Sequence, residues 1–164
     1  MPKIFLVILL LGLLAGCDDN RSTYSIATGG TAGLYYPYGG GMASILSARL
    51  NNINVKAEVT GGSVINVIQV ARKESEMGIA MADVVTSAYV GGGRFPEPLP
   101  LRVLFTAYPN IVHILSLAES EFDSVASLGG KRVALGAAGS GTAVAATNVL
   151  TSLGVDDIAP GYLN

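Results

Sequence analysis

The sequence predicts an α/β domain with a parallel sheet, and two observations support that prediction. Half of the 164 residues are apolar while only 13% are charged, a balance typical of strands that helices cover on both faces. In addition, one unit recurs along the chain: a strand, a turn of Gly, Ser and Thr, and then a helix. In an open parallel sheet such turns lie at the carboxyl ends of the strands, where ligands bind.

The first half of the chain contains three of these units. Alternation of apolar and polar residues predicts strands, and apolar residues three and four apart predict helices. Ser63 precedes an apolar helical run and is expected to be its N-cap, because a serine hydroxyl accepts a backbone N–H bond from the first turn. The expected strands are 24–28, 53–59 and 77–82, and the expected helices are 42–51, 64–73 and 84–89.

The second half begins with a loop rich in Gly and Pro at 91–100. Two apolar runs follow, separated by Pro109 and Asn110, and both are expected to be strands. A turn with a short helical piece, another strand and an apolar helix complete the predicted elements, and the tail at 154–164 shows no clear element. The expected strands are 101–108, 111–117 and 131–136, and the helical regions are 125–130 and 143–153.

Four strand-to-helix turns carry hydroxyl or carboxylate side chains, and they predict a binding cleft rather than ordinary surface loops. Glycine allows the backbone to approach a ligand closely, and a helix start presents free N–H groups that favour an anion. For Asp83 two interpretations remain open, a helix cap or an acceptor for a ligand. The turns are Thr28–Gly41, Thr60–Ser63, the turn at Asp83, and Gly136–Thr142.

Several functions are disfavoured by what the sequence lacks. No glycine turn contains the Gly-Lys-Ser/Thr of a phosphate loop, and Gly136, Gly139 and Gly141 invert the spacing of the dinucleotide fingerprint. A net charge of −2 without a basic run argues against nucleic acid as a partner. The only histidine, His113, is expected to be a strand histidine with one hydrogen-bond partner. We therefore predict no catalytic residue, no metal site and no cofactor.

Residues 1–17 predict a lipoprotein signal peptide. Lys3 precedes an apolar run of about 11 residues, shorter than the ~20 that a membrane-spanning helix needs. Leu14–Cys17 then matches the bacterial lipobox, which implies lipid attachment to Cys17. This is the only cysteine, so no disulfide is expected. Residues 18–23 form a polar tether, and the anchor would hold the domain in the periplasm or at the cell surface.

The turn motifs, in this order, resemble the TAXI family, the extracytoplasmic solute-binding subunits of tripartite ATP-independent periplasmic (TRAP) transporters. The resemblance is carried by Thr28–Thr31 with Tyr35–Pro37, Thr60–Asn66, Asp83, and Gly130–Val133 with Gly139–Thr142. It implies a periplasmic-binding-protein type II-like fold whose two lobes close over a small carboxylate, glutamate-like or a dicarboxylate. The protein would deliver this solute to membrane transporter subunits without chemistry. The implied ligand-facing residues are Gly30, Thr31, Tyr35, Ser63, Asn66, Asp83, Ser140 and Thr142.

The chain departs from this family in two respects. Met81 stands where members often carry a glutamine, so its ligand specificity is expected to differ. Both lobes together exceed the ~100–150 residues of one domain, so we expect a fragment. In that fragment a nearly complete first lobe (24–117) precedes a crossover and an incomplete, truncated second lobe (118–164). Two alternatives remain: a lipid-anchored α/β enzyme that uses a turn serine as a hydrolase does, and a surface or antigenic lipoprotein without a working cleft.

Overall fold

The structure is a computed structural model that describes residues 21–120 and 122–163. The predicted signal peptide, Cys17 and the first half of the predicted tether (residues 18–20) lie outside these residues. Of the helices described, none is both long and apolar enough to cross a membrane. The elements are β1 (Ser22–Ala27), α2 (Tyr35–Arg49), β2 (Ile53–Glu58), α3 (Ser63–Ala71), β3 (Met77–Gly78), α4 (Ala82–Val90), η1 (Val125–Leu128), β4 (Arg132–Gly136), α5 (Gly141–Ser152) and β5 (Ala159–Tyr162).

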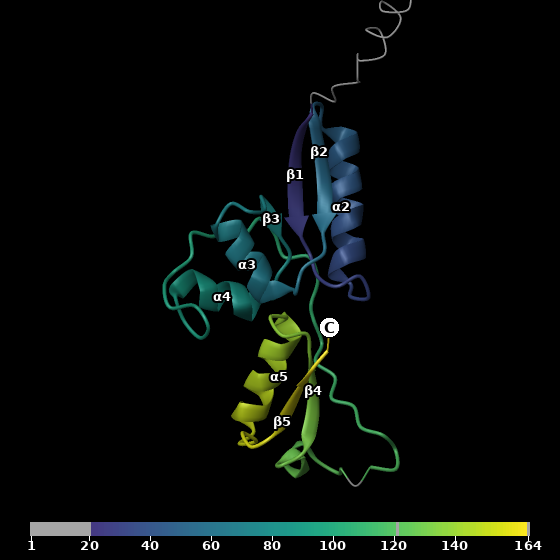
Figure 1. Cartoon of the computed structure of the whole chain (residues 1–164), viewed down its shortest axis with the longest axis vertical. Coiled ribbons are helices and arrows are strands. Elements are labelled where there is room, and N and C mark those ends of the chain that lie inside the picture. Colours follow the sequence, from purple (N-terminus) through teal and green to yellow (C-terminus); the bar gives the residue numbers. More distant parts are fainter. Residues whose placement is uncertain (1–20, 121, 164) are drawn as a thin grey trace, which may run out of the picture.

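The first three strands form a parallel sheet, the N-terminal sheet, in the order β2-β1-β3. β1 and β2 pair from Ser22↔Ile53 onwards, and Ile26 pairs with Met77 of β3. Helix α2 lies along β1 and β2, while α3 and α4 lie on the β3 side (Figure 1). A core of Ile26, Ala43 and Val55 joins α2 to these strands. The predicted α/β class with a parallel sheet is therefore confirmed.

The last two strands form a second parallel pair, the C-terminal sheet, of β4 and β5. Helix α5 packs against β4 around Leu135, Ala143 and Leu150. No element was expected in the tail that contains β5. It becomes a strand because residues 159–162 find backbone partners in β4, starting at Arg132↔Ala159.

A third core joins α3, α4 and the loop that follows α4. Helix α4 ends at Gly91, whose φ of +75° is the left-handed conformation common at helix C-termini. A Cβ on Gly91 would lie 2.7 Å from the ring nitrogen of Pro98, so the loop folds back tightly here. The buried members of this core are Val64, Val67, Val84, Ala88, Phe95 and Leu101.

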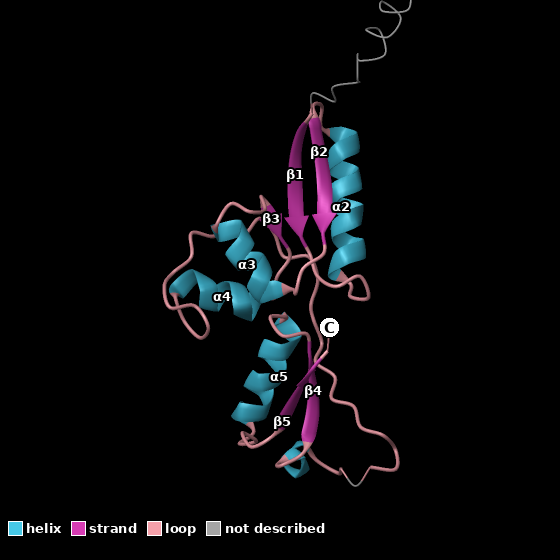
Figure 2. Ribbon diagram, in the orientation of Figure 1, coloured by secondary structure: helices cyan, strands magenta, loops and turns pink. Residues whose placement is uncertain are grey.

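Residues 101–117, called here the extended segment, form no strand, which overturns the prediction of two strands there. Figure 2 draws this part of the chain as a loop between the two sheets. A strand is stabilised by a neighbour that accepts and donates its backbone bonds, and among the described residues no strand pairs with this segment. Its apolar side chains beyond Leu101 are consequently exposed: Leu115 is 88% and Ile111 77% accessible.

Three other boundaries differ from the sequence prediction. Helix α2 starts at Tyr35 instead of residue 42, so it includes the glycines Gly39, Gly40 and Gly41. Pro37 lies in its first turn, where a missing N–H costs no helical bond. Strand β1 starts at Ser22, within the predicted tether, and β3 is reduced to two residues.

Candidate functional site

The strand-to-helix turns open onto one large cleft of about 1710 Å³. One wall contains residues 29–30, 33–35, 59–63 and 65, and the opposite wall contains residues 132–142. Residues 110–117 of the extended segment also line the cleft. In Figure 1 the ends of β1 and β2 point toward the start of α5. The volume exceeds the ~300–1,000 Å³ of a typical ligand pocket, which indicates an open cleft between two walls.

Five of the eight predicted site residues line this cleft: Gly30, Tyr35, Ser63, Ser140 and Thr142. They come from the starts of three helices and from the turn after β1. The other three, Thr31, Asn66 and Asp83, lie elsewhere and are described below.

Asn66 is completely buried behind the turns, contrary to the expectation that it faces the ligand. Its Nδ2 donates to the backbone oxygens of Thr28 at 2.5 Å and Ile79 at 2.7 Å, and its Oδ1 accepts from the Thr60 hydroxyl at 2.6 Å. Both amide protons are thus used within the protein. Asn66 is a positioning residue that ties the ends of β1 and β2 and the chain beyond β3 to helix α3.

Ser63 is the first residue of α3, and the prediction that it is the N-cap was wrong. The N-cap is Gly62, at a φ of +104°, and the amide of Gly62 donates to the Thr60 hydroxyl at 3.0 Å. The Ser63 hydroxyl instead accepts from the Met81 amide at 3.1 Å. Ser63 therefore fixes the chain at Met81, and only 1% of the residue is exposed.

The second and third glycine turns lie against each other across the floor of the cleft. The Val64 amide donates to the Gly139 carbonyl oxygen at 3.1 Å. A Cβ on Gly62 would lie 3.2 Å from Cα of Ser140, and a Cβ on Gly141 would lie 2.6 Å from Oγ of Ser63. Glycine is favoured at these positions because Gly62, at a positive φ, faces the backbone of Ser140, and Gly141 faces the side chains of Met81 and Ser63.

Ser140 is the N-cap of α5, and its hydroxyl accepts from the Ala143 amide at 3.1 Å. The hydroxyl proton of Ser140 stays free to donate to another group. Thr142 lies exposed in the first turn of the same helix. Within the described chain, the amides of Gly141 and Thr142 have no hydrogen-bond acceptor.

Thr31 and Asp83 are exposed and lie off the cleft wall. Thr31 belongs to the turn that precedes α2. Asp83 is in the first turn of α4, where its Oδ1 accepts from the Val84 amide at 2.8 Å. Asp83 is not the cap of α4, because the N-cap is Met81 and no side chain caps this helix.

The first turns of the four long helices of the cleft region differ in charge. Helices α2, α3 and α5 begin at the cleft, and none carries an acidic residue in its first turn. Helix α4 carries Asp83 in its first turn; its N-cap Met81 lines the cleft, whereas Asp83 does not. Because each helix start is electropositive, three uncompensated helix dipoles converge on the cleft.

Several residues that line the cleft were not predicted from the sequence, because they lie in the extended segment or beyond it. The charged residues among those lining the cleft are Asp123 and Arg132, and His113 also lines it. His113 is exposed and lies in no strand, and its side chain has no hydrogen-bond partner among the residues described, contrary to expectation. Tyr108 lines the cleft as well, and no spacing signal in the sequence pointed to it.

Among residues 21–120 and 122–163, no hydrogen bond joins a Ser or Thr hydroxyl of this cleft to a histidine or a carboxylate. The Ser63 and Ser140 hydroxyls each accept a backbone N–H bond, and in the described chain neither is hydrogen-bonded to a histidine or a carboxylate. Residues 21–120 and 122–163 also contain no group of three potential His, Cys, Asp or Glu metal ligands.

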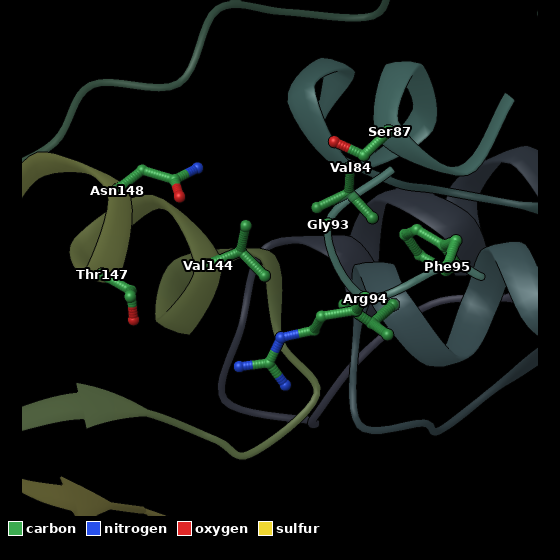
Figure 3. A pocket seen from close by; sticks show the side chains of 9 residues that line it. Val84, Ser87, Gly93, Arg94, Phe95, Val144, Thr147 and Asn148 are labelled. Carbon is green, nitrogen blue, oxygen red and sulfur yellow. The ribbon is translucent and has the colours of Figure 1, made fainter. Parts of the chain in front are cut away.

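A second cavity of about 130 Å³ lies between α4, the loop after it, and α5. Figure 3 shows Val144, Thr147 and Asn148 on α5 facing Ser87, Arg94 and Phe95 across this space. Its lining is mostly apolar. We interpret it as imperfect packing between α4 and α5 at the back of the cleft.

The model of the NMT1-like family matches residues 26–163, which include the end of β1, all the later strands and every turn of the cleft. The chain belongs to the NMT1-like family. This family is related to periplasmic solute-binding proteins, so ligand binding rather than catalysis is its general role, and its members are typically extracytoplasmic. The mixed α/β structure with parallel sheets is consistent with a periplasmic-binding-protein-like fold.

Proposed function

We propose that this protein is a TAXI-type solute-binding subunit of a TRAP transporter and that its cleft captures a small carboxylate. The observation that supports this most directly is the convergence of α2, α3 and α5 on the cleft with no acidic residue in any first turn. Unpaired amides and helix dipoles together favour a bound anion. Membership in the NMT1-like family agrees with a binding role.

A carboxylate suits the donors that this cleft provides. The amides of Gly141 and Thr142 and the hydroxyl protons of Ser140 and Thr142 can donate to its oxygens. Tyr35 would cover the alkyl part of the solute, and Gly30 would allow its backbone close to it. A glutamate-like molecule or a dicarboxylate would therefore bind without metal or cofactor.

The proposed function also includes a lipid anchor and partner subunits in the membrane. Cys17 would carry the lipid anchor and hold the protein at the membrane, in the periplasm or at the cell surface. Membrane transporter subunits would receive the solute. The incomplete second lobe over residues 118–164 stays a prediction.

The proposal is tested by thermal unfolding and calorimetry with a panel of carboxylates. A ligand that binds only the folded state raises the melting temperature. At a concentration of 100 times its Kd, it increases the free energy of unfolding by about 2.7 kcal/mol. The variant Thr142→Asp places a carboxylate at the start of α5, where it favours the helix but repels an anion. We expect the free variant to be at least as stable as the wild type and to bind the solute at least about tenfold more weakly.

The control is Thr151→Asp, which adds the same side chain to the last turn of the same helix, at an exposed residue outside the cleft lining. It should leave affinity unchanged. If no carboxylate stabilises the wild type, or if both variants bind equally well, the cleft is not the anion site proposed here.

A further inference from the structure

The hydroxyl of Tyr108 is buried, and in the described chain it has no hydrogen-bond partner. A buried polar group without a partner is rare, because it has lost its bonds to water and gained none in return. Tyr108 is also one of the residues that line the cleft. Tyr108 thus brings to the wall of the cleft a hydroxyl donor that has no acceptor in the described chain.

Two tyrosines of α2 surround this phenol. The ring of Tyr38 packs edge-to-face against that of Tyr108, with centroids 5.5 Å apart and planes at 67°. Tyr35 lies one turn earlier on α2 and lines the cleft. This ring contact attaches the extended segment to α2, and we call Tyr35, Tyr38 and Tyr108 the tyrosine cluster.

The electrostatics of the cluster keep Tyr108 protonated. Burial raises the pKa of the Tyr108 phenol above its ordinary value of about 10, and neighbouring Tyr35 and Tyr38 raise it further. At neutral pH the group is thus a hydrogen-bond donor. The first turn of α2 carries no acidic residue that could accept this proton.

We propose that Tyr108 contacts the ligand and determines specificity, its hydroxyl donating to a second carboxylate of a solute whose first carboxylate binds at the helix starts. This inference rests on the proposed function of the cleft. The extended segment has no strand partner among the residues described, so a small shift of it can bring the phenol to the solute. The cleft would then prefer a dicarboxylate or glutamate over a monocarboxylate of the same length.

The test uses Tyr108→Phe, which removes the hydroxyl and keeps the ring that packs on Tyr38. Calorimetric titrations compare succinate and L-glutamate with butyrate, which has the chain length of succinate but one carboxylate. A bond to a charged acceptor corresponds to about a tenfold or greater loss of affinity, which we expect for succinate or glutamate only. The control is Tyr89→Phe on α4, an exposed residue outside the cleft lining, which should leave all three affinities unchanged.

A second readout separates ligand contact from a structural role. The free Tyr108→Phe protein should melt no lower than the wild type, because the deleted hydroxyl makes no bond in the described chain. If the wild type binds a dicarboxylate and the variant binds it equally well, this inference fails while the proposed function stands. A variant that melts lower and loses all ligands alike also overturns it. If the wild type binds none of the three, both proposals fail.

Discussion

Two regions of this protein carry strand-like sequences and have opposite fates. β4 contains Leu135, which is 4% exposed, with β5 beside it and α5 over it. The extended segment contains Leu115 in an equally apolar run, yet that residue is 88% exposed and no described strand pairs with it. An apolar alternating run thus becomes a strand only where another backbone accepts its hydrogen bonds and another surface covers its side chains.

The same contrast applies to the cleft walls. The turns at 59–65 and 137–142 are held by backbone bonds, a buried asparagine and close glycine contacts. The wall formed by the extended segment is attached to α2 through the ring pair of Tyr38 and Tyr108. One side of the cleft is therefore rigid, and the other is free to adapt to a solute.

The largest expected effect comes from making one substitution in both regions. Leu135→Ala should lower the free energy of unfolding by about 4 kcal/mol, because it leaves a cavity in a packed core. Leu115→Ala should change it by less than about 0.5 kcal/mol, as is usual for exposed sites. Urea unfolding measures both, and similar losses would show that the extended segment is packed in solution.

The second largest effect is expected for Asn66→Ala, which should lower the free energy of unfolding by about 3 kcal/mol. The substitution removes the side chain that bonds two backbone carbonyl oxygens and the Thr60 hydroxyl. Asn51→Ala serves as the control, since Asn51 is exposed and should contribute less than about 0.5 kcal/mol. A loss as small as that of the control would mean that Asn66 does not hold the turns together.

A pair of glycines on α2 gives a smaller effect with opposite signs. A Cβ on Gly39 would collide with the methyl group of Thr28, so Gly39→Ala should cost about 2 kcal/mol. Nothing lies within 4 Å of a Cβ on Gly40, so Gly40→Ala should stabilise the helix by about 0.5–1 kcal/mol. Chemical denaturation of both variants measures the difference, and two gains would exclude the close contact of α2 with Thr28.

The smallest effect concerns pH and the tyrosine cluster. Because folding raises the pKa of Tyr108, the folded state holds this proton more tightly than the unfolded state. Its contribution to stability is complete below about pH 10 and is lost as pH rises through the raised pKa. As pH rises above about 10, the melting temperature of the wild type should therefore fall more steeply than that of Tyr108→Phe. Parallel curves would place Tyr108 in solvent.

Sequence patterns predicted much of the fold and part of the candidate site. The strand-turn-helix units at β1, β2 and β4 were expected, and so were the turns at Thr60–Ser63 and Gly136–Thr142 that open onto the cleft. The role of Asn66 was not predictable, because its partners Thr28 and Ile79 are 38 and 13 residues away in the chain. The start of α2 was missed for a related reason. Three consecutive glycines indicate a loop locally, but Gly39 lies within the helix because Thr28 packs against it and leaves no room for a Cβ.

The sequence alone determines the α/β class, the glycine turns and the electropositive helix starts, because each of these features depends on residues that are neighbours in the chain. Packing decides the rest. It turns Ser63 from the expected cap into an acceptor for Met81, leaves Asp83 off the cleft wall, and brings Tyr108 to Tyr38 from 70 positions away in the chain. These features depend on backbones that meet only after folding, because hydrogen bonds and close contacts form according to distance in space and not in sequence.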